Sequence, residues 1–180
     1  MNIFLPYEND IRKSVESLDD VRLNKQAVEI YQLLTMAESE IETGQPTSKG
    51  HYHHPVYQFY KSNPRFLAYY GYECCREYNY RFKKWLKPIE YFDDIMDKYK
   101  MFKYDEDSFI IAMEIPEFTP YYMEGSKDSP DCIRTTENVS RLFQDKLCKK
   151  WDNDKAKGRP PKWTNRQVPE FYKERMKGEQ

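Results

Sequence analysis

Four polar residues share one helical face near the start of the chain. In "LDDVRLNKQAVEIYQLL", residues 18–34, Arg22, Lys25, Gln26 and Glu29 recur at helical spacing, opposite an apolar stripe. A carboxylate set among cations and an amide could transfer protons beside an anionic substrate. Charged helix faces are, however, commonly just solvated. This pattern therefore predicts a helix and leaves the role of Glu29 open.

The chain carries no familiar nucleophile motif. No Gly-rich phosphate loop and no serine elbow occur in the sequence, and no base is marked for a cysteine nucleophile. The α-amino group of Met1 is an alternative, because its reference pKa is about 7.7–8.0, against about 10.4 for lysine. Near neutral pH part of it is uncharged and could form a Schiff base with a sugar C1′. A nearby carboxylate would then assist elimination.

Basic and aromatic residues concentrate in the last third of the chain. Residues 133–177 hold thirteen Lys or Arg against six Asp or Glu, whereas the residues before them are net acidic. Cations neutralise phosphates, and aromatic rings stack on unpaired bases. The residues that could contact nucleic acid in this way are Arg141, Lys162, Trp163, Asn165 and Arg166. The alternative is a C-terminal arm whose Trp163 and Phe171 dock on the core.

Two further groups admit a functional and a structural interpretation. His54, before Pro55, could order a turn or lie near a phosphate. Glu73 and Glu77, one helical turn apart, could form an acid/base pair or ion pairs with neighbouring arginines. The run "HYHH" at 51–54 has no second ligand cluster, so we expect no metal site.

Length and composition narrow the class of protein. A chain of 180 residues fits one domain, and its 16 Tyr and 10 Phe predict an aromatic core. No run of 18 apolar residues or secretory start is present, so we expect no membrane span and a cytoplasmic location. The four cysteines are expected to be reduced thiols packed as small hydrophobic groups.

The hydrophobic pattern predicts an all-α, compact, single-domain helical bundle. Three long helices are expected at about 19–42, 64–87 and 130–151, with short ones after Pro55 and at 89–100. Ser17 with Asp20 resembles a capping box for the first long helix. We divide the chain into a helical domain, 1–158, with a variable insertion at 88–130, and a basic aromatic tail, 159–180, that packs on it. Extended structure is expected in the insertion, around 109–113.

Motifs in the same order resemble a known family. "MNIFLPYEND…SLDDVRLNKQAVEIYQLL", "HHPVYQFY", "FLAYYGYECCREYNYR" and "PPKWTNRQVPEFY" are similar to stretches of the pyrimidine-dimer DNA glycosylase/AP-lyase family, of the phage endonuclease V type. The resemblance covers most of the chain and leaves 88–130 without a match. It implies an all-α enzyme in which a terminal amine attacks C1′ and a helix glutamate serves as acid/base. By position these are Met1 and Glu29.

The resemblance also implies a partner and a binding set. The partner is duplex DNA with a damaged or modified base, bound by a monomer that needs no metal or cofactor. The expected binding residues are Asn2, Arg22, Lys25, Gln26, His54, Arg141, Lys162, Trp163, Asn165 and Arg166. Family members commonly expose a small residue after Met removal, whereas Asn2 is large enough for Met1 to be retained.

Two other functions remain open from the sequence. The same fold could be a non-catalytic pocket for a nucleotide or modified base, which the acidic body of the chain favours. It could also be an enzyme acting on free modified nucleotides, for which the basic tail would matter little.

Overall fold

A computed structural model describes most of the chain. It describes residues 2–7, 10–48, 50, 52–105, 108–111, 118–121, 131–134 and 137–178, with the backbone alone at 102–105, 108–111, 118–121, 131–134 and 137. The helices in these ranges are α1 (Ile11–Glu16), α2 (Asp20–Thr43), α3 (Pro55–Tyr60), α4 (Pro64–Phe82), α5 (Pro88–Lys98), α6 (Glu137–Ala156) and α7 (Glu170–Gly178). The predicted all-α fold is therefore confirmed.

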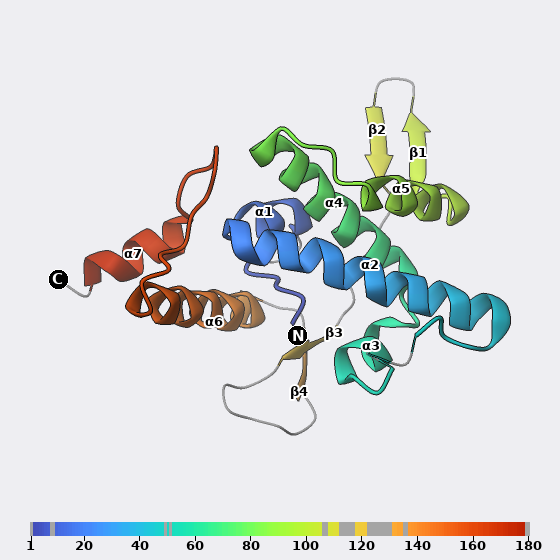
Figure 1. Ribbon diagram of the computed structural model, residues 1–180, viewed down its shortest axis with the longest axis horizontal. Helices are drawn as coiled ribbons and strands as arrows, with labels where there is room; N and C mark the ends of the chain where they lie inside the picture. Colours follow the sequence, from blue (N-terminus) through green and yellow to red (C-terminus); the bar gives the residue numbers. More distant parts are fainter. Residues whose placement is uncertain are drawn as a thin grey trace.

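Helix α2 crosses the middle of the molecule and packs on α4 (Figure 1). Helix α5 covers α4 on one side, and α6 and α7 lie at the other end of the molecule. The strands of the described residues form two antiparallel hairpins, β1 (Phe102–Asp105) with β2 (Ser108–Ile111) and β3 (Phe118–Tyr121) with β4 (Asp131–Arg134). The first three strands lie in the expected insertion, and β4 follows it.

Local signals set several helix ends. Gly44 terminates α2 in the left-handed region, with φ of 73°, which glycine adopts without steric cost. The side chain of His54 accepts a hydrogen bond from the amide of Val56 and caps α3. The side chain of Asn63 accepts one from Phe66 and caps α4. Pro55 and Pro64 follow these caps, where proline's missing donor is harmless.

Three expected boundaries are wrong. Helix α1 was not expected, and it makes Asp19 rather than Ser17 the residue before α2; Asp19 forms no side-chain cap there. Helix α4 ends at Phe82 rather than 87, because Lys83 turns left-handed. Helix α6 begins at Glu137 rather than 130, because β4 occupies residues 131–134, and it ends at Ala156.

No helix among the described residues is long and apolar enough to cross a membrane. The core is instead built from side chains of every helix and of the N-terminal segment. It is rich in aromatic rings, such as the stacked Tyr60 and Phe66, whose centroids lie 4.9 Å apart. Such rings bury large areas and lock their neighbours in position.

Gly71 is required by the packing of α4 against α5. A Cβ at this position would overlap the ring of buried Phe92. We expect Gly71→Ala to lower the free energy of unfolding by about 1–3 kcal/mol through overpacking, partly offset by the roughly 1 kcal/mol helix preference of alanine over glycine. Urea unfolding measures this effect. If the collision is the cause, Gly71→Ala in a Phe92→Leu background should cost clearly less; equal costs in both backgrounds would contradict it.

Candidate active site

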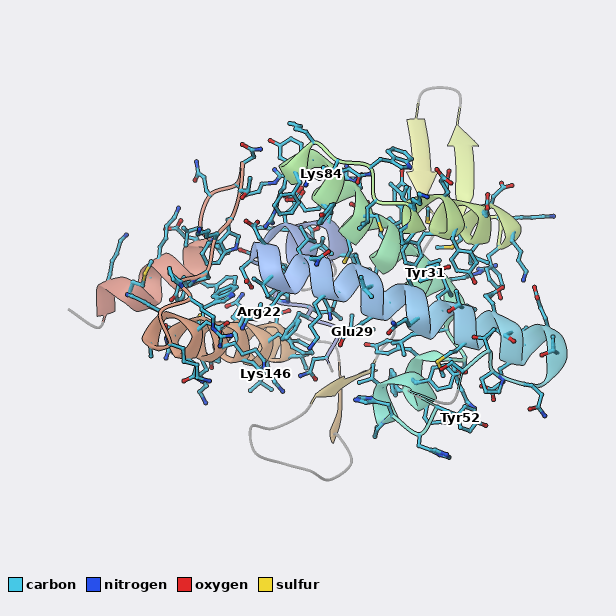
Figure 2. The ribbon with its side chains drawn as sticks, in the orientation of Figure 1. Arg22, Glu29, Tyr31, Tyr52, Lys84 and Lys146 are labelled. Carbon is cyan, nitrogen blue, oxygen red and sulfur yellow. The ribbon has the colours of Figure 1, made fainter. Side chains whose placement is uncertain are left out.

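A pocket of about 280 Å³ lies where the N-terminal segment, α2 and α6 meet. Its volume is close to the lower end of the range for small-molecule sites, roughly 300–1,000 Å³. Figure 2 shows Arg22 and Glu29 along the edge of α2 that lies toward α6, and Lys146 on α6. The lining residues are Asn2, Phe4, Val21, Arg22, Lys25, Gln26, Glu29 and Lys150.

The helical spacing of α2 brings the predicted polar face to this pocket. Arg22, Lys25, Gln26 and Glu29 all line it, together with Asn2. Five residues singled out from the sequence therefore meet in one place. Among the predicted site residues that the structure describes, these five line a single cavity.

The N-terminal segment is held firmly against the helices. The hydroxyl of buried Tyr70 donates to the carbonyl of Phe4 over 2.9 Å, and the side-chain amide of Gln144 donates to the carbonyl of Pro6 over 2.7 Å. The ring of Phe4 also packs edge-on against Phe143, with centroids 6.0 Å apart. These contacts fix Asn2 at the pocket wall. Met1 itself lies outside the described residues.

Glu29 sits in a polar, partly enclosed environment. Its side chain is 17% exposed, and Nζ of Lys25 lies 3.6 Å from one carboxylate oxygen. Nε2 of Gln26 donates to the other oxygen over 3.4 Å. A cation and an amide so placed orient the carboxylate within the pocket.

Two amide oxygens in the pocket wall are buried without a protein partner. Oδ1 of Asn2 and Oε1 of Gln26 have no hydrogen-bond donor among the described residues. Buried acceptors are normally satisfied, since an unpaired one costs about 1–3 kcal/mol. Both oxygens are enclosed by the protein, although other atoms of Asn2 and Gln26 line the pocket.

Arg22 joins α2 to α6 rather than standing free. Its guanidinium lies 3.0 Å from Asp19 and 2.7 Å from Asp154. The hydrogen bond from Arg22 holds the pKa of Asp154 below its ordinary value. Asp19 is buried and also accepts from the indole of Trp151 over 2.8 Å. Because two carboxylates neutralise Arg22, the lysines are the cations better placed to meet a ligand's charge.

The basic tail is anchored in the interior. Trp163 is 9% exposed; its indole donates to the carbonyl of Ser17 over 2.8 Å, and its ring packs edge-on against Trp151. Arg166 contacts both carboxylate oxygens of Glu77, at 2.9 and 2.7 Å. In this arrangement Trp163 cannot stack on a base, and Arg166 is already paired. The docked-arm interpretation describes both residues.

Other predicted binding residues lie away from the pocket wall. His54 caps α3, and the side-chain amide of Asn165 donates to the carbonyl of Arg81. The carbonyl of Lys162 accepts from Asp20 at the start of α2. Arg141 is exposed on α6. None of the four is among the pocket-lining residues.

The two carboxylates on α4 form ion pairs. Glu73 is buried and lies 2.7 Å from Arg76 and 3.5 Å from Arg12. Glu77 is buried between Arg81 and Arg166. Burial alone would raise the pKa of Glu77, but hydrogen bonds from Arg166 and Arg81 hold it below the ordinary value. These contacts support the ion-pair interpretation over an acid/base pair.

Metal-binding side chains do not cluster in the described part of the chain, where no group of three His, Cys, Asp or Glu is placed to hold an ion. Cys74, Cys75 and Cys148 are buried free thiols whose pKa burial raises. The side chain of Cys132 lies outside the described residues.

Three pocket residues were not predicted from the sequence. Phe4, Val21 and Lys150 line the wall beside the predicted face. Phe4 and Val21 each adjoin a conspicuous motif, and Val21 is exposed, which is unusual for the first turn of a packed helix. Lys150 is one of many lysines on α6, and no local signal distinguishes it.

The fold and pocket define a small helical protein with a carboxylate, amides and cations around a cavity. A family model described as pyrimidine dimer DNA glycosylase matches residues 1–86. This match confirms the resemblance expected from the N-terminal motifs. It spans α1 to α4 and contains every pocket-lining residue except Lys150. By its printed description, that family is one of DNA glycosylases. Searches of curated proteins and of solved structures matched nothing.

Proposed function

We propose that the protein is a DNA glycosylase with AP-lyase activity that excises a damaged pyrimidine through a Schiff base on its N-terminal amine. One observation carries the proposal: Glu29 and Asn2 line the same pocket. The helix carboxylate expected to act as acid/base thus lies beside the residue that follows Met1. The family match over residues 1–86 supports the glycosylase part of the proposal.

The terminal amine of Met1 is the proposed nucleophile. Asn2, which is bonded directly to Met1, lines the pocket. By its reference pKa, an α-amine is partly neutral near pH 7.5 without any burial, unlike the amine of a lysine side chain in general. It is the better nucleophile of the amines that can reach the site.

The reaction then follows two stages. The amine attacks C1′ while the glycosidic C1′–N bond breaks, and the base leaves with the bonding electron pair and takes up a proton. The amine loses a proton as the sugar ring opens to the imine. For strand cleavage, a proton is removed from C2′ and the 3′ phosphate leaves. Glu29 is placed to relay these protons.

Binding is assigned to the groups that the pocket leaves available. Lys25, 67% exposed, and Lys150 would neutralise phosphates beside the reacting sugar. The side-chain amides of Asn2 and Gln26, which line the pocket, would exchange hydrogen bonds with a sugar hydroxyl or a base N–H. Arg22 would keep α2 and α6 at the spacing the pocket requires.

Borohydride trapping on abasic duplex DNA tests the proposal. A reducible imine should give a covalent protein–DNA adduct, detected by mass. Intact-mass analysis first establishes whether Met1 is the terminal residue. We expect the adduct with a free terminus and its loss when an uncleaved extension precedes Met1.

Lys150→Met provides the matched control for the trapping experiment. It removes the pocket lysine while leaving the terminus free, so its adduct should persist. An adduct that survives the extension but disappears in Lys150→Met would contradict the role of Met1. No adduct in any variant, with duplex DNA still bound, would identify a binding protein instead.

A further inference from the structure

The end of α4 carries an exposed aromatic and basic surface that the pocket does not use. We name it the α4-end patch and define it as Tyr80, Lys83, Lys84, Trp85 and Lys87. Trp85 is 65% exposed and Tyr80 46% exposed. By contrast, the other two tryptophans of the chain, Trp151 and Trp163, are buried.

The local backbone projects this patch outward. Lys83 ends α4 with φ of 52°, and the chain then turns toward α5. The amide of Leu86 donates to the side chain of Asn79 over 2.7 Å, which fixes the turn. The indole of Trp85 donates to Glu90 over 3.0 Å. The ring is thus oriented by its edge while most of its surface meets solvent.

The charges around Trp85 are predominantly positive. Lys83, Lys84 and Lys87 are all exposed, against the single carboxylate of Glu90 that Trp85 contacts. Lys83 and Arg166 both lie over the ring of Tyr80, 4.7 and 4.3 Å from its centroid. Cations interleaved with exposed rings are the combination that binds single-stranded nucleic acid.

The α4-end patch is separate from the pocket. Figure 2 shows Lys84 at the end of α4, on the other side of α2 from Arg22 and Lys146. None of its five residues lines the pocket. A ligand on this patch therefore contacts the protein independently of the reacting sugar.

We propose that the α4-end patch binds an unpaired stretch of DNA strand, with a base stacked on Trp85 and phosphates held by Lys84 and Lys87. A base in a duplex offers only its edge, whereas an unpaired base offers a full face to an indole ring. The choice of DNA over other polyanions rests on the proposed function. Exposed tryptophan with lysines also suits an anionic lipid surface, which the test distinguishes.

Tryptophan fluorescence of the full chain reports on this site directly. Titration with an oligothymidylate should quench the fluorescence of Trp85. The quenching can be assigned to Trp85 because the other two tryptophans are shielded in the core. In Trp85→Leu the quenching should vanish and the affinity should fall by about 5- to 150-fold, the range for loss of one stacked base. In Lys84→Gln/Lys87→Gln the slope of log K against log salt should become shallower by about 1.4.

Lys155→Gln/Lys157→Gln is the matched charge control, since both lysines are exposed, at the end of α6 and directly after it, and the net charge changes equally. It should leave the salt slope unchanged. Quenching that persists in Trp85→Leu, or that occurs only with vesicles of phosphatidylglycerol and phosphatidylcholine, overturns the inference. So does the absence of quenching with either.

The catalytic proposal and the α4-end patch proposal can be tested independently of each other. Trp85→Leu should still form the borohydride adduct on a short abasic duplex. Oligothymidylate quenching without any adduct in the unmodified chain would sink the catalytic proposal alone. An adduct without quenching would contradict only the proposal that the α4-end patch binds unpaired DNA.

Discussion

Glu29→Gln is expected to slow base excision by about 10²–10⁴-fold, the usual contribution of general acid–base catalysis. Glutamine keeps the size of the side chain but cannot carry a proton between the sugar, the amine and the leaving base. Single-turnover excision from a pyrimidine-dimer duplex measures the effect. Substrate binding should change much less, because Glu29 repels phosphate and its loss removes no cation.

Glu42→Gln is the matched control for this prediction. Glu42 lies near the end of α2, is 59% exposed and pairs with Lys98 over 2.7 Å. The same chemical change at this position should leave excision within about twofold of the unmodified protein, as for a solvated surface pair. Equal rates for Glu29→Gln and the unmodified chain would remove Glu29 from the mechanism.

Arg81→Met is expected to cost the largest share of stability of any variant considered. Arg81 is fully buried and contacts Glu77 at 2.7 Å and Asp20 at 3.0 Å. It also donates to the carbonyls of Leu18 and Glu16, each over 2.8 Å. One guanidinium thus ties α4 to α1, to α2 and to the turn between them.

Removing that guanidinium leaves buried acceptors and a buried carboxylate with fewer partners. Breaking a buried ion pair from one side costs about 3–5 kcal/mol, which for a chain of this size lowers Tm by roughly 6–20 °C. Calorimetry or thermal circular dichroism measures the shift.

Arg159→Met removes the same side chain from an exposed pair and serves as control. Arg159 is 70% exposed and lies 3.5 Å from Asp154, so its loss should cost about 1 kcal/mol or less. If both variants unfold at the same temperature as the unmodified chain, the buried network does not contribute to stability.

Local signals determined much of the framework. The spacing of Arg22, Lys25, Gln26 and Glu29 placed four side chains on one face of α2 before any fold was known, and all four line the pocket. The Asn63–Pro64 and His54–Pro55 pairs marked helix starts that the structure retains. These features depend on neighbours within about four residues, so the sequence carries them directly.

The contact partners of charged and aromatic side chains could not be predicted from the local sequence. Nothing local separates Arg166, which meets Glu77 inside the protein, from Lys84, which faces solvent. Trp163 and Trp85 are equally plausible stacking rings in the sequence, yet one is buried and the other exposed. Which of them faces solvent depends on residues brought together from α1, α4 and the tail.

The sequence by itself therefore determined the long helices in outline, the starts of α3 and α4, and the polar face that carries Glu29. Only the tertiary structure decided that Lys150 of α6 completes the pocket, that Arg22 is neutralised by Asp19 and Asp154, and that the tail is docked. The physical reason is the separation along the chain over which each kind of interaction acts. Backbone hydrogen bonds and helical periodicity act over one or two turns, whereas burial and ion pairing join residues more than a hundred positions apart.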